Sequence, residues 1–190
     1  MKTQIDLKQV LKKGFISDEM EFERALILER KLRLLIESQP ELSESRKQLR
    51  SIIKDYEKQN WSNDETITSE KIKESDDAEY IAELERAFLM NRKEIIKKKL
   101  SENGLNQQDL GTILGHSKSY TSELMNGICP FNNKDLIIIH RLFNIKLEYL
   151  ILTIIPQVER SRIKDSISKI KKPNFQSKLK FKKKDLEFLF

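Results

Sequence analysis

The sequence predicts an all-α protein, and two observations lead to that fold class. The 190 residues include only five glycines and four prolines, whereas sheets need frequent turns and β-branched runs. Apolar residues recur instead at intervals of three and four, which is the spacing of one helix face. Apolar residues make up 38% of the chain and charged residues 35%, so we expect a modest core and a large solvated or binding surface. That balance disfavours a compact enzyme built around a deep pocket.

The first region, residues 1–61, is expected to form an acidic helical hairpin. Ser17 is placed to cap a helix with acidic residues in its first turn, and this helix runs to about residue 38. Pro40 disfavours helix at the residue before it, and Ser43 then starts a second helix that ends near Trp61. The short connection makes the two helices antiparallel neighbours.

Residues 62–77, "SNDETITSEKIKESDD", are predicted to form a charged linker. Half of these residues are charged and only Ile67 and Ile72 are aliphatic, which is too little apolar surface to hold a packed segment. Helical periodicity returns at Ala78 and continues to about Glu102, before Gly104 provides a C-terminal stop signal.

Four short helices are expected to follow in residues 105–151. Asn106 caps a helix over 107–114, a turn at 115–117 leads to a helix over 118–126, Asn132 caps a helix that ends at Phe143, and a last short helix covers 147–151. With the helix over 78–102, these spacings describe a five-helix DNA-binding domain, residues 78–155, whose second and third helices form a helix-turn-helix.

Charge divides the chain in the same way. Residues 1–90 hold 16 Lys and Arg against 20 Asp and Glu, residues 91–155 hold 9 against 6, and residues 156–190 hold 11 against 4. A polyanion is therefore the expected partner of the basic back half, and a different partner that of the acidic front half.

The basic C-terminal extension, residues 156–190, has two parts. Ile163, Ile167 and Ile170 share one face of a basic helix. The segment "KLKFKKKDLEFLF" then alternates as a strand would, and two interpretations stay open for it. It pairs with a strand supplied by a dimer mate or other partner, or it is a disordered basic tail that adds DNA affinity.

The helix over 118–126 has the residue types of a DNA-reading helix. Thr121 and Leu124 are the inward anchors, whereas Lys118 suits guanine acceptors or phosphate and Glu123 can accept from cytosine. Tyr120 either stacks on the sugar-phosphate or packs on the domain's own surface. Gln107 begins the preceding helix, where backbone N–H groups favour a phosphate. The expected DNA-binding residues are Gln107, Ser117, Lys118, Ser119, Tyr120, Ser122, Glu123 and Asn126.

Leu105–Ile151, which contains "SKSYTSELMNGICPF" and "IHRLFNI", resembles the lambda-repressor-like helix-turn-helix of phage-repressor-like (Xre-type) regulators, and specifically that of HigA-type antitoxins. Phe22–Trp61 is similar to the acidic hairpin that precedes this domain in the family. The resemblance implies a homodimer that represses its own promoter by binding double-stranded operator DNA, and that neutralises a HigB/RelE-like mRNA endonuclease toxin. It also implies that Gln107 clamps a phosphate and that Lys118, Ser119, Ser122 and Glu123 read bases.

Three positions depart from the family pattern. Gly111 stands where alanine is usual, Thr121 where valine or isoleucine is usual, and Ile128–Cys129 where a basic pair often contacts phosphate. The last departure removes an expected backbone contact, for which the basic tail is a possible substitute.

The expected function is not enzymatic, and no cofactor or metal is expected. The chain shows no Cys/His/Asp constellation, no phosphate-cradling glycine loop and no metal-ligand spacing, since it has one cysteine and two histidines. No apolar run reaches the roughly 18 to 20 residues that span a bilayer, and the N-terminus lacks the apolar core of a secretory signal. A cytoplasmic protein is therefore expected. Two alternatives to the antitoxin stay open: a transcriptional regulator without a toxin partner, and an interaction scaffold that does not bind DNA.

Overall fold

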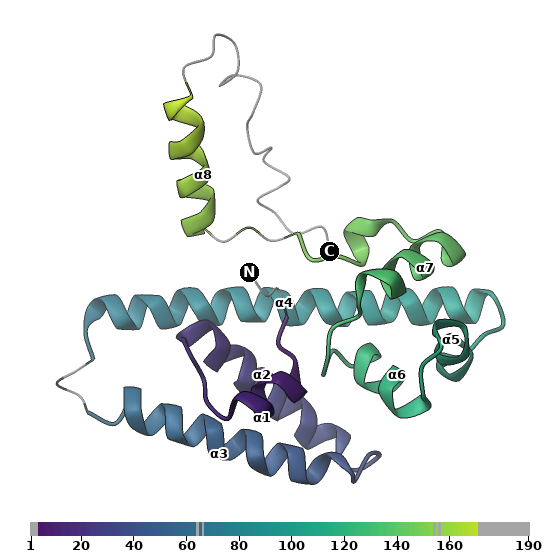
Figure 1. The fold of residues 1–190 in the computed structure, drawn as a ribbon, viewed down its shortest axis with the longest axis horizontal. Coiled ribbons are helices and arrows are strands. Elements are labelled where there is room, and N and C mark those ends of the chain that lie inside the picture. Colours follow the sequence, from purple (N-terminus) through teal and green to yellow (C-terminus); the bar gives the residue numbers. More distant parts are fainter. Residues whose placement is uncertain (1–3, 64, 66, 154, 156, 171–190) are drawn as a thin grey trace. The chain divides into compact units, whose positions relative to one another are not determined.

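The computed structural model of the chain describes residues 4–63, 65, 67–153, 155 and 157–170. Every regular element in these residues is a helix (Figure 1), which confirms the all-α fold class. The chain falls into two compact units, Met1–Ile151 and Leu152–Phe190. The helices of the first unit are α1 (Leu7–Lys13), α2 (Glu19–Leu35), α3 (Leu42–Asn60), α4 (Ser69–Glu102), α5 (Gln107–Leu114), α6 (Lys118–Met125), α7 (Asn133–Phe143) and the 3-10 helix η2 (Leu147–Tyr149).

The hairpin expected from the sequence corresponds to α2 and α3, which pack against each other. Asp18, one residue later than the predicted cap, accepts a hydrogen bond from the Glu21 backbone N–H at 2.8 Å. The N-terminal segment adds the short helix α1, which the sequence analysis did not predict. Asp6 caps it by accepting from Gln9 N–H at 3.3 Å, and Gly14 ends it with a φ of 75°, a backbone conformation that glycine adopts without strain.

The predicted linker is only partly a linker. α4 begins at Ser69, so nine of the residues assigned to the segment 62–77, from 69 onward, are helical. Thr68 caps the helix by accepting from Lys71 N–H at 3.2 Å, and Glu and Lys are good helix formers even where apolar residues are scarce. Ala78 and Ala82 then anchor this part of α4, since both are buried and α2 packs along the helix. The prediction of a linker from the low content of apolar residues was therefore wrong for residues 69–77.

The long helix α4 is shared by the two ends of the first unit. Figure 1 shows α1, α2 and α3 beside its first part, whereas α5, α6 and α7 gather around its second part. Each group has its own hydrophobic core: one is formed by residues of α1–α3, the other by residues from Ile96 to Leu150. Residues 1–151 form a single compact unit, and the expected domain boundaries at residues 61, 77 and 155 stay predictions.

Polar contacts fasten α2 to α3 and α4. Arg24 donates to both oxygens of Glu85 on α4, at 2.7 Å from Nε and 2.5 Å from Nη2, which is the bidentate geometry. Glu19 accepts from Tyr56 on α3 at 2.9 Å and from Ser75 on α4 at 3.0 Å. Burial raises the pKa of the Glu85 carboxyl, against the opposing effect of Arg24. These partly buried contacts fix the position of α2.

The second unit contains α8 (Gln157–Lys169) in its described part. Ile163 and Ile167 are half-buried and four residues apart, so they share one face of α8, whereas Ile170 lies just beyond its end. The strand-like segment at residues 178–190 lies outside the described residues.

Candidate nucleic-acid interface

The candidate interface is built from α5, a three-residue turn and α6. Asn106 and Asp109 form a capping box at the start of α5, with Asn106 Oδ1 accepting from Gln108 and Asp109 N–H and Asp109 accepting from Asn106 N–H at 2.8 Å. Gly115 ends α5 with a φ of 74°. Ser117 caps α6 by accepting from Tyr120 N–H at 3.2 Å. Two eight-residue helices therefore meet at a sharply defined turn.

The inner face of α6 is anchored as the sequence predicted. Thr121 and Leu124 are each 0% exposed, and Thr121 Oγ1 donates to the Ser117 carbonyl at 2.8 Å. Two of the family departures also meet here, because a Cβ on Gly111 would lie 2.6 Å from Thr121 Oγ1 and 3.2 Å from the His116 carbonyl oxygen. Glycine at 111 thus accommodates the threonine hydroxyl at 121.

The first turn of α6 is open to solvent. Ser117, Lys118 and Ser119 are all exposed. Within the part of the chain that the structure describes, the Lys118 ammonium has no carboxylate partner. An exposed ammonium beside a helix N-terminus is a suitable contact for a phosphate or a guanine edge. Gln107, at the start of α5, is half-buried.

The last turn of α6 is covered by other parts of the first unit. Lys8 of α1 pairs with Glu123 at 3.0 Å, and its ammonium also lies 5.2 Å from the centre of the Tyr120 ring. Gln39, from the connection between α2 and α3, donates to Ser122 Oγ at 2.9 Å. Tyr120, Ser122 and Glu123 are accordingly half-buried.

Asn126, the last predicted DNA-binding residue, is also engaged: its side-chain oxygen accepts from Lys93 Nζ of α4 at 2.7 Å. The structure therefore brings the predicted residues of α6 into two groups. Ser117, Lys118 and Ser119 are exposed and close to the turn, whereas Tyr120, Ser122, Glu123 and Asn126 contact α1, the α2–α3 connection or α4.

The residues that contact the last turn of α6 were not predicted from the sequence. Lys8, Gln39 and Lys93 lie on different elements, far from α6 in the sequence, and each engages α6 through one polar side chain. No periodicity marks such residues, since hydropathy patterns identify buried faces and not single polar contacts. Asp135 was also missed: it is 1% exposed and lies 3.0 Å from His116 Nε2, which holds the turn against α7.

The loop after α6 contains Ile128 and Cys129, where the HigA-type pattern often has a basic pair. Gly127 has a φ of 64°, and the next two residues point into different cores: Ile128 packs with α1–α3, whereas Cys129 belongs to the core of the second group. The Leu7 backbone N–H also donates to the Ile128 carbonyl at 3.1 Å. A basic pair here would be buried, so the apolar pair is required by the packing of α1. Burial, with Glu123 nearby, raises the pKa of the Cys129 thiol to about 12, which leaves little reactive thiolate.

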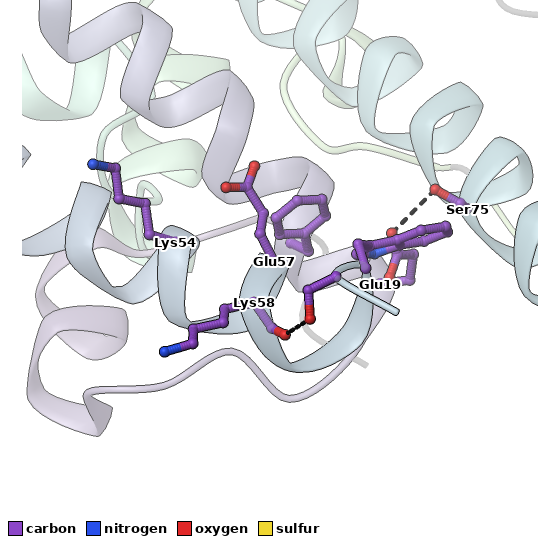
Figure 2. Close-up of a pocket in the computed structure, with 8 residues that line it drawn as sticks. Glu19, Lys54, Glu57, Lys58 and Ser75 are labelled. Carbon is purple, nitrogen blue, oxygen red and sulfur yellow. Dashed lines mark hydrogen bonds between the residues drawn. The ribbon is translucent and has the colours of Figure 1, made fainter. Parts of the chain in front are cut away.

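A second surface feature lies at the other end of the first unit. An open hollow of ≈ 620 Å³ is bounded by Glu19 and Phe22 of α2, by the end of α3 and by Ser75 of α4 (Figure 2). The Trp61 indole N–H is buried and has no hydrogen-bond partner among the residues that the structure describes. The Lys71 ammonium lies 4.9 Å from the centre of that ring. Figure 2 shows the ammonium groups of Lys54 and Lys58 directed away from Glu19 and Ser75.

Two further observations concern other site types. In the described ranges, no group of three or more His, Cys, Asp or Glu side chains is arranged to hold a metal ion. Among the same residues, no helix combines the length and the apolar character that crossing a bilayer requires.

Comparisons with known proteins give no match: no family model, no curated protein and no solved structure is similar to this chain. The functional interpretation therefore depends on the residues and their geometry.

Proposed function

We propose that this chain is a helix-turn-helix antitoxin of the HigA type. In this proposal, α5 and α6 bind double-stranded operator DNA, two copies of the chain form the binding dimer, and the acidic α2–α3 end neutralises a HigB/RelE-like mRNA endonuclease toxin. A cytoplasmic location follows from these partners. One observation carries the DNA-binding part: α6 is anchored by Thr121 and Leu124 while Ser117, Lys118 and Ser119 in its first turn are exposed.

The geometry suits a helix that enters the major groove by its N-terminal end. A recognition helix of this class contacts base edges with its first residues, and the helix before it contacts the backbone. Lys118 would reach guanine or phosphate, Ser119 would bond either, and Gln107 would hold a phosphate at the start of α5. The covered last turn would then keep Ser122, Glu123 and Asn126 away from the DNA.

Lys118→Ala tests this part of the proposal. Binding of the full-length protein to a DNA fragment carrying its own promoter is measured by fluorescence anisotropy at one fixed salt concentration, since phosphate contacts make affinity salt-dependent. We expect a loss of about 1 to 3 kcal/mol if Lys118 reads guanine, and a smaller loss that is equal for all sequences if it contacts phosphate.

Lys47→Ala is the matched control, because Lys47 is an exposed lysine of α3 whose side chain is 75% accessible. It removes one lysine charge outside α5 and α6 and should leave affinity nearly unchanged. An unchanged affinity for Lys118→Ala would mean that α6 does not contact the DNA as proposed.

Exposed apolar side chains support the dimer. Ile137 and Leu142 on α7 are each 55% exposed, Leu147 of η2 is 41% exposed and Ile151 after it is 42% exposed. These residues are close in sequence and sit at the end of the unit that carries α5 and α6. A second copy that covered them would bury this apolar surface, and a dimer with two α6 helices is what a palindromic operator requires.

The hollow beside Trp61 supports the toxin-binding part. Trp61 lines this hollow, and tryptophan is enriched among the residues that dominate binding energy. The test first asks whether an adjacent gene encodes a small basic protein, and then co-expresses that protein with the chain. Trp61→Ala should lose neutralisation of that protein in co-expression and keep promoter binding, whereas Lys47→Ala should keep both.

A non-DNA-binding interaction scaffold is the second candidate. It is favoured by the contacts of Ser122, Glu123 and Asn126, which occupy part of the face that a DNA reader would expose. Failure of the unsubstituted protein to bind its promoter would select this alternative. Promoter binding without a toxin gene nearby would select a transcriptional regulator.

A further inference from the structure

A small cavity lies between α2, α4 and the loop after α6, away from the exposed turn of α6. Its volume is ≈ 20 Å³, and a cavity needs roughly 10 to 15 Å³ to hold one water-sized species. Its lining residues are Gln4, Ile5, Arg24, Ile27, Leu28 and Lys31 from the N-terminal part, with Ala82, Glu85, Arg86 and Leu89 of α4 and Gly127 of the loop.

Two hydrogen-bond donors converge on this cavity at Gly127. A Cβ built on Gly127 would lie 3.5 Å from Lys31 Nζ and 3.6 Å from Gln4 Nε2. Both donors therefore lie close to Gly127 on the cavity wall, where the apolar Leu89 Cδ1 lies 3.1 Å from the same point. Among the described residues, Gln4 Nε2 is buried and has no hydrogen-bond partner, and Lys31 Nζ takes part in none of the ion pairs.

The orientation of the Gln4 amide is fixed by Arg92. Arg92 Nη2 donates to Gln4 Oε1 at 3.4 Å, and its Nη1 donates to the Leu150 carbonyl at 3.3 Å. A flipped amide would turn its NH₂ group towards the guanidinium, where two donors would oppose each other. The oxygen of Gln4 is thus assigned to Arg92, and the nitrogen is the atom beside Lys31.

The charges around Lys31 are positive. Burial, together with the neighbouring cations Lys93, Arg86 and Arg92, lowers the pKa of Lys31 to about 8. Glu85 is the carboxylate on the cavity wall, but Arg24 occupies both of its oxygens, at 2.7 Å and 2.5 Å. Arg86 pairs with Glu83 instead, at 2.5 Å. The side chains on the cavity wall therefore offer donors and positive charge, and the carboxylate of Glu85 is already engaged by Arg24.

We propose that this cavity binds one chloride ion between Lys31 Nζ and Gln4 Nε2. A chloride ion accepts from both donors and offsets the positive charge of the Lys31 ammonium, which a water molecule would not do. The volume suits a single monatomic ion and is too small for a phosphate. The bound ion joins α2 to the segment before α1, beside the loop after α6, so it stabilises the packing of the first unit.

Thermal unfolding of the full-length protein tests the proposal. Sodium gluconate is replaced stepwise by sodium chloride at constant ionic strength, because gluconate is too large to enter the cavity. We expect Tm to rise and then saturate, by about 2 to 4 °C once chloride exceeds its dissociation constant several-fold. An equal Tm in the two salts would overturn the proposal.

Two substitutions separate the site from general salt effects. Lys31→Met should abolish the chloride-dependent rise, whereas the exposed-lysine control Lys47→Met should keep it; a rise of equal size in Lys31→Met would overturn the proposal. Gln4→Glu gives a readout even if Lys31→Met fails to fold. The new carboxylate would take the place of the ion, so this variant should be as stable in gluconate as the unsubstituted protein is in chloride. A full chloride response in Gln4→Glu would contradict the site.

Crystals of the full-length protein grown in sodium bromide locate the ion directly. The expected result is an anomalous peak between Lys31 and Gln4, absent from crystals of the Gln4→Glu variant. No peak at that position in the unsubstituted protein would overturn the assignment.

Discussion

The two ends of α6 differ in a way that the helix itself does not explain. Ser117, Lys118 and Ser119 at its start are exposed, whereas Ser122, Glu123 and Asn126 near its end contact the α2–α3 connection, α1 and α4. Both ends are polar, and both fit the residue types of a DNA-reading face. Surrounding structure therefore decides which polar residues of a helix are available to a partner.

The covering segment is held mainly by apolar packing and backbone bonding. Ile128 is 1% exposed and packs with the core of α1–α3, and its carbonyl accepts from Leu7 N–H at 3.1 Å. The polar pairs on α6 are secondary, since an exposed ion pair contributes about 1 kcal/mol or less. Substitutions in the apolar contact should therefore lower the free energy of unfolding more than substitutions in the polar pairs do.

Ile128→Ala should have the largest effect on this arrangement. Removing a buried isoleucine side chain costs about 2 to 5 kcal/mol, and the loss here falls on the contact between α1 and the loop. Urea unfolding gives the free energy, and hydrogen exchange of α1 amides reports whether the cover loosens. Leu34→Ala, at a side chain that is 73% exposed, is the control and should stay within about 0.5 kcal/mol. Similar losses for both variants would show that Ile128 does not anchor the cover.

Gly111→Ala should have an intermediate effect on the free energy of unfolding. The substitution lies against the buried face of α6, which holds Thr121. In most helices this change stabilises by roughly 0.5 to 1 kcal/mol, but here the added Cβ would lie 2.6 Å from Thr121 Oγ1. We expect a loss of about 1 to 3 kcal/mol in urea unfolding. The cost should be smaller in a Thr121→Ala background, which removes the opposing oxygen. Equal costs in the two backgrounds would show that the contact with Thr121 is not the cause.

Local signals predicted most of the helices near α6. Asn106, Gly115 and Asn132 each mark a boundary that the structure has, as a cap of α5, the end of α5 and the cap of α7. These signals are local because a cap satisfies backbone groups within one turn. Asp6 and Gly14 give the same kind of signal for α1, but its seven residues are too few to show a helical period.

The division into domains and the cover on α6 could not be predicted in this way. The start of α4 has few apolar residues, and its helix is stabilised by packing of Ala78 and Ala82 against a helix distant in sequence. Gln39 reaches Ser122 across 83 residues. Such contacts depend on the tertiary arrangement, which a single sequence does not encode as a pattern.

Lys8→Met should have the smallest effect and is the most direct test of the comparison between the two ends of α6. The Lys8 side chain is 68% accessible although Glu123 is only 14% accessible, so the pair contributes about 0.2 to 1 kcal/mol. Promoter affinity should stay within about twofold of the unsubstituted protein, because the Leu7–Ile128 bond and Gln39 still cover the last turn. Lys12→Met, elsewhere on α1, controls for the lost charge. A tenfold gain in affinity for Lys8→Met alone, equivalent to about 1.4 kcal/mol, would mean that freeing Glu123 completes the DNA-reading face. The last turn of α6 would then be a regulated part of the interface, and the cover would have to open for full binding.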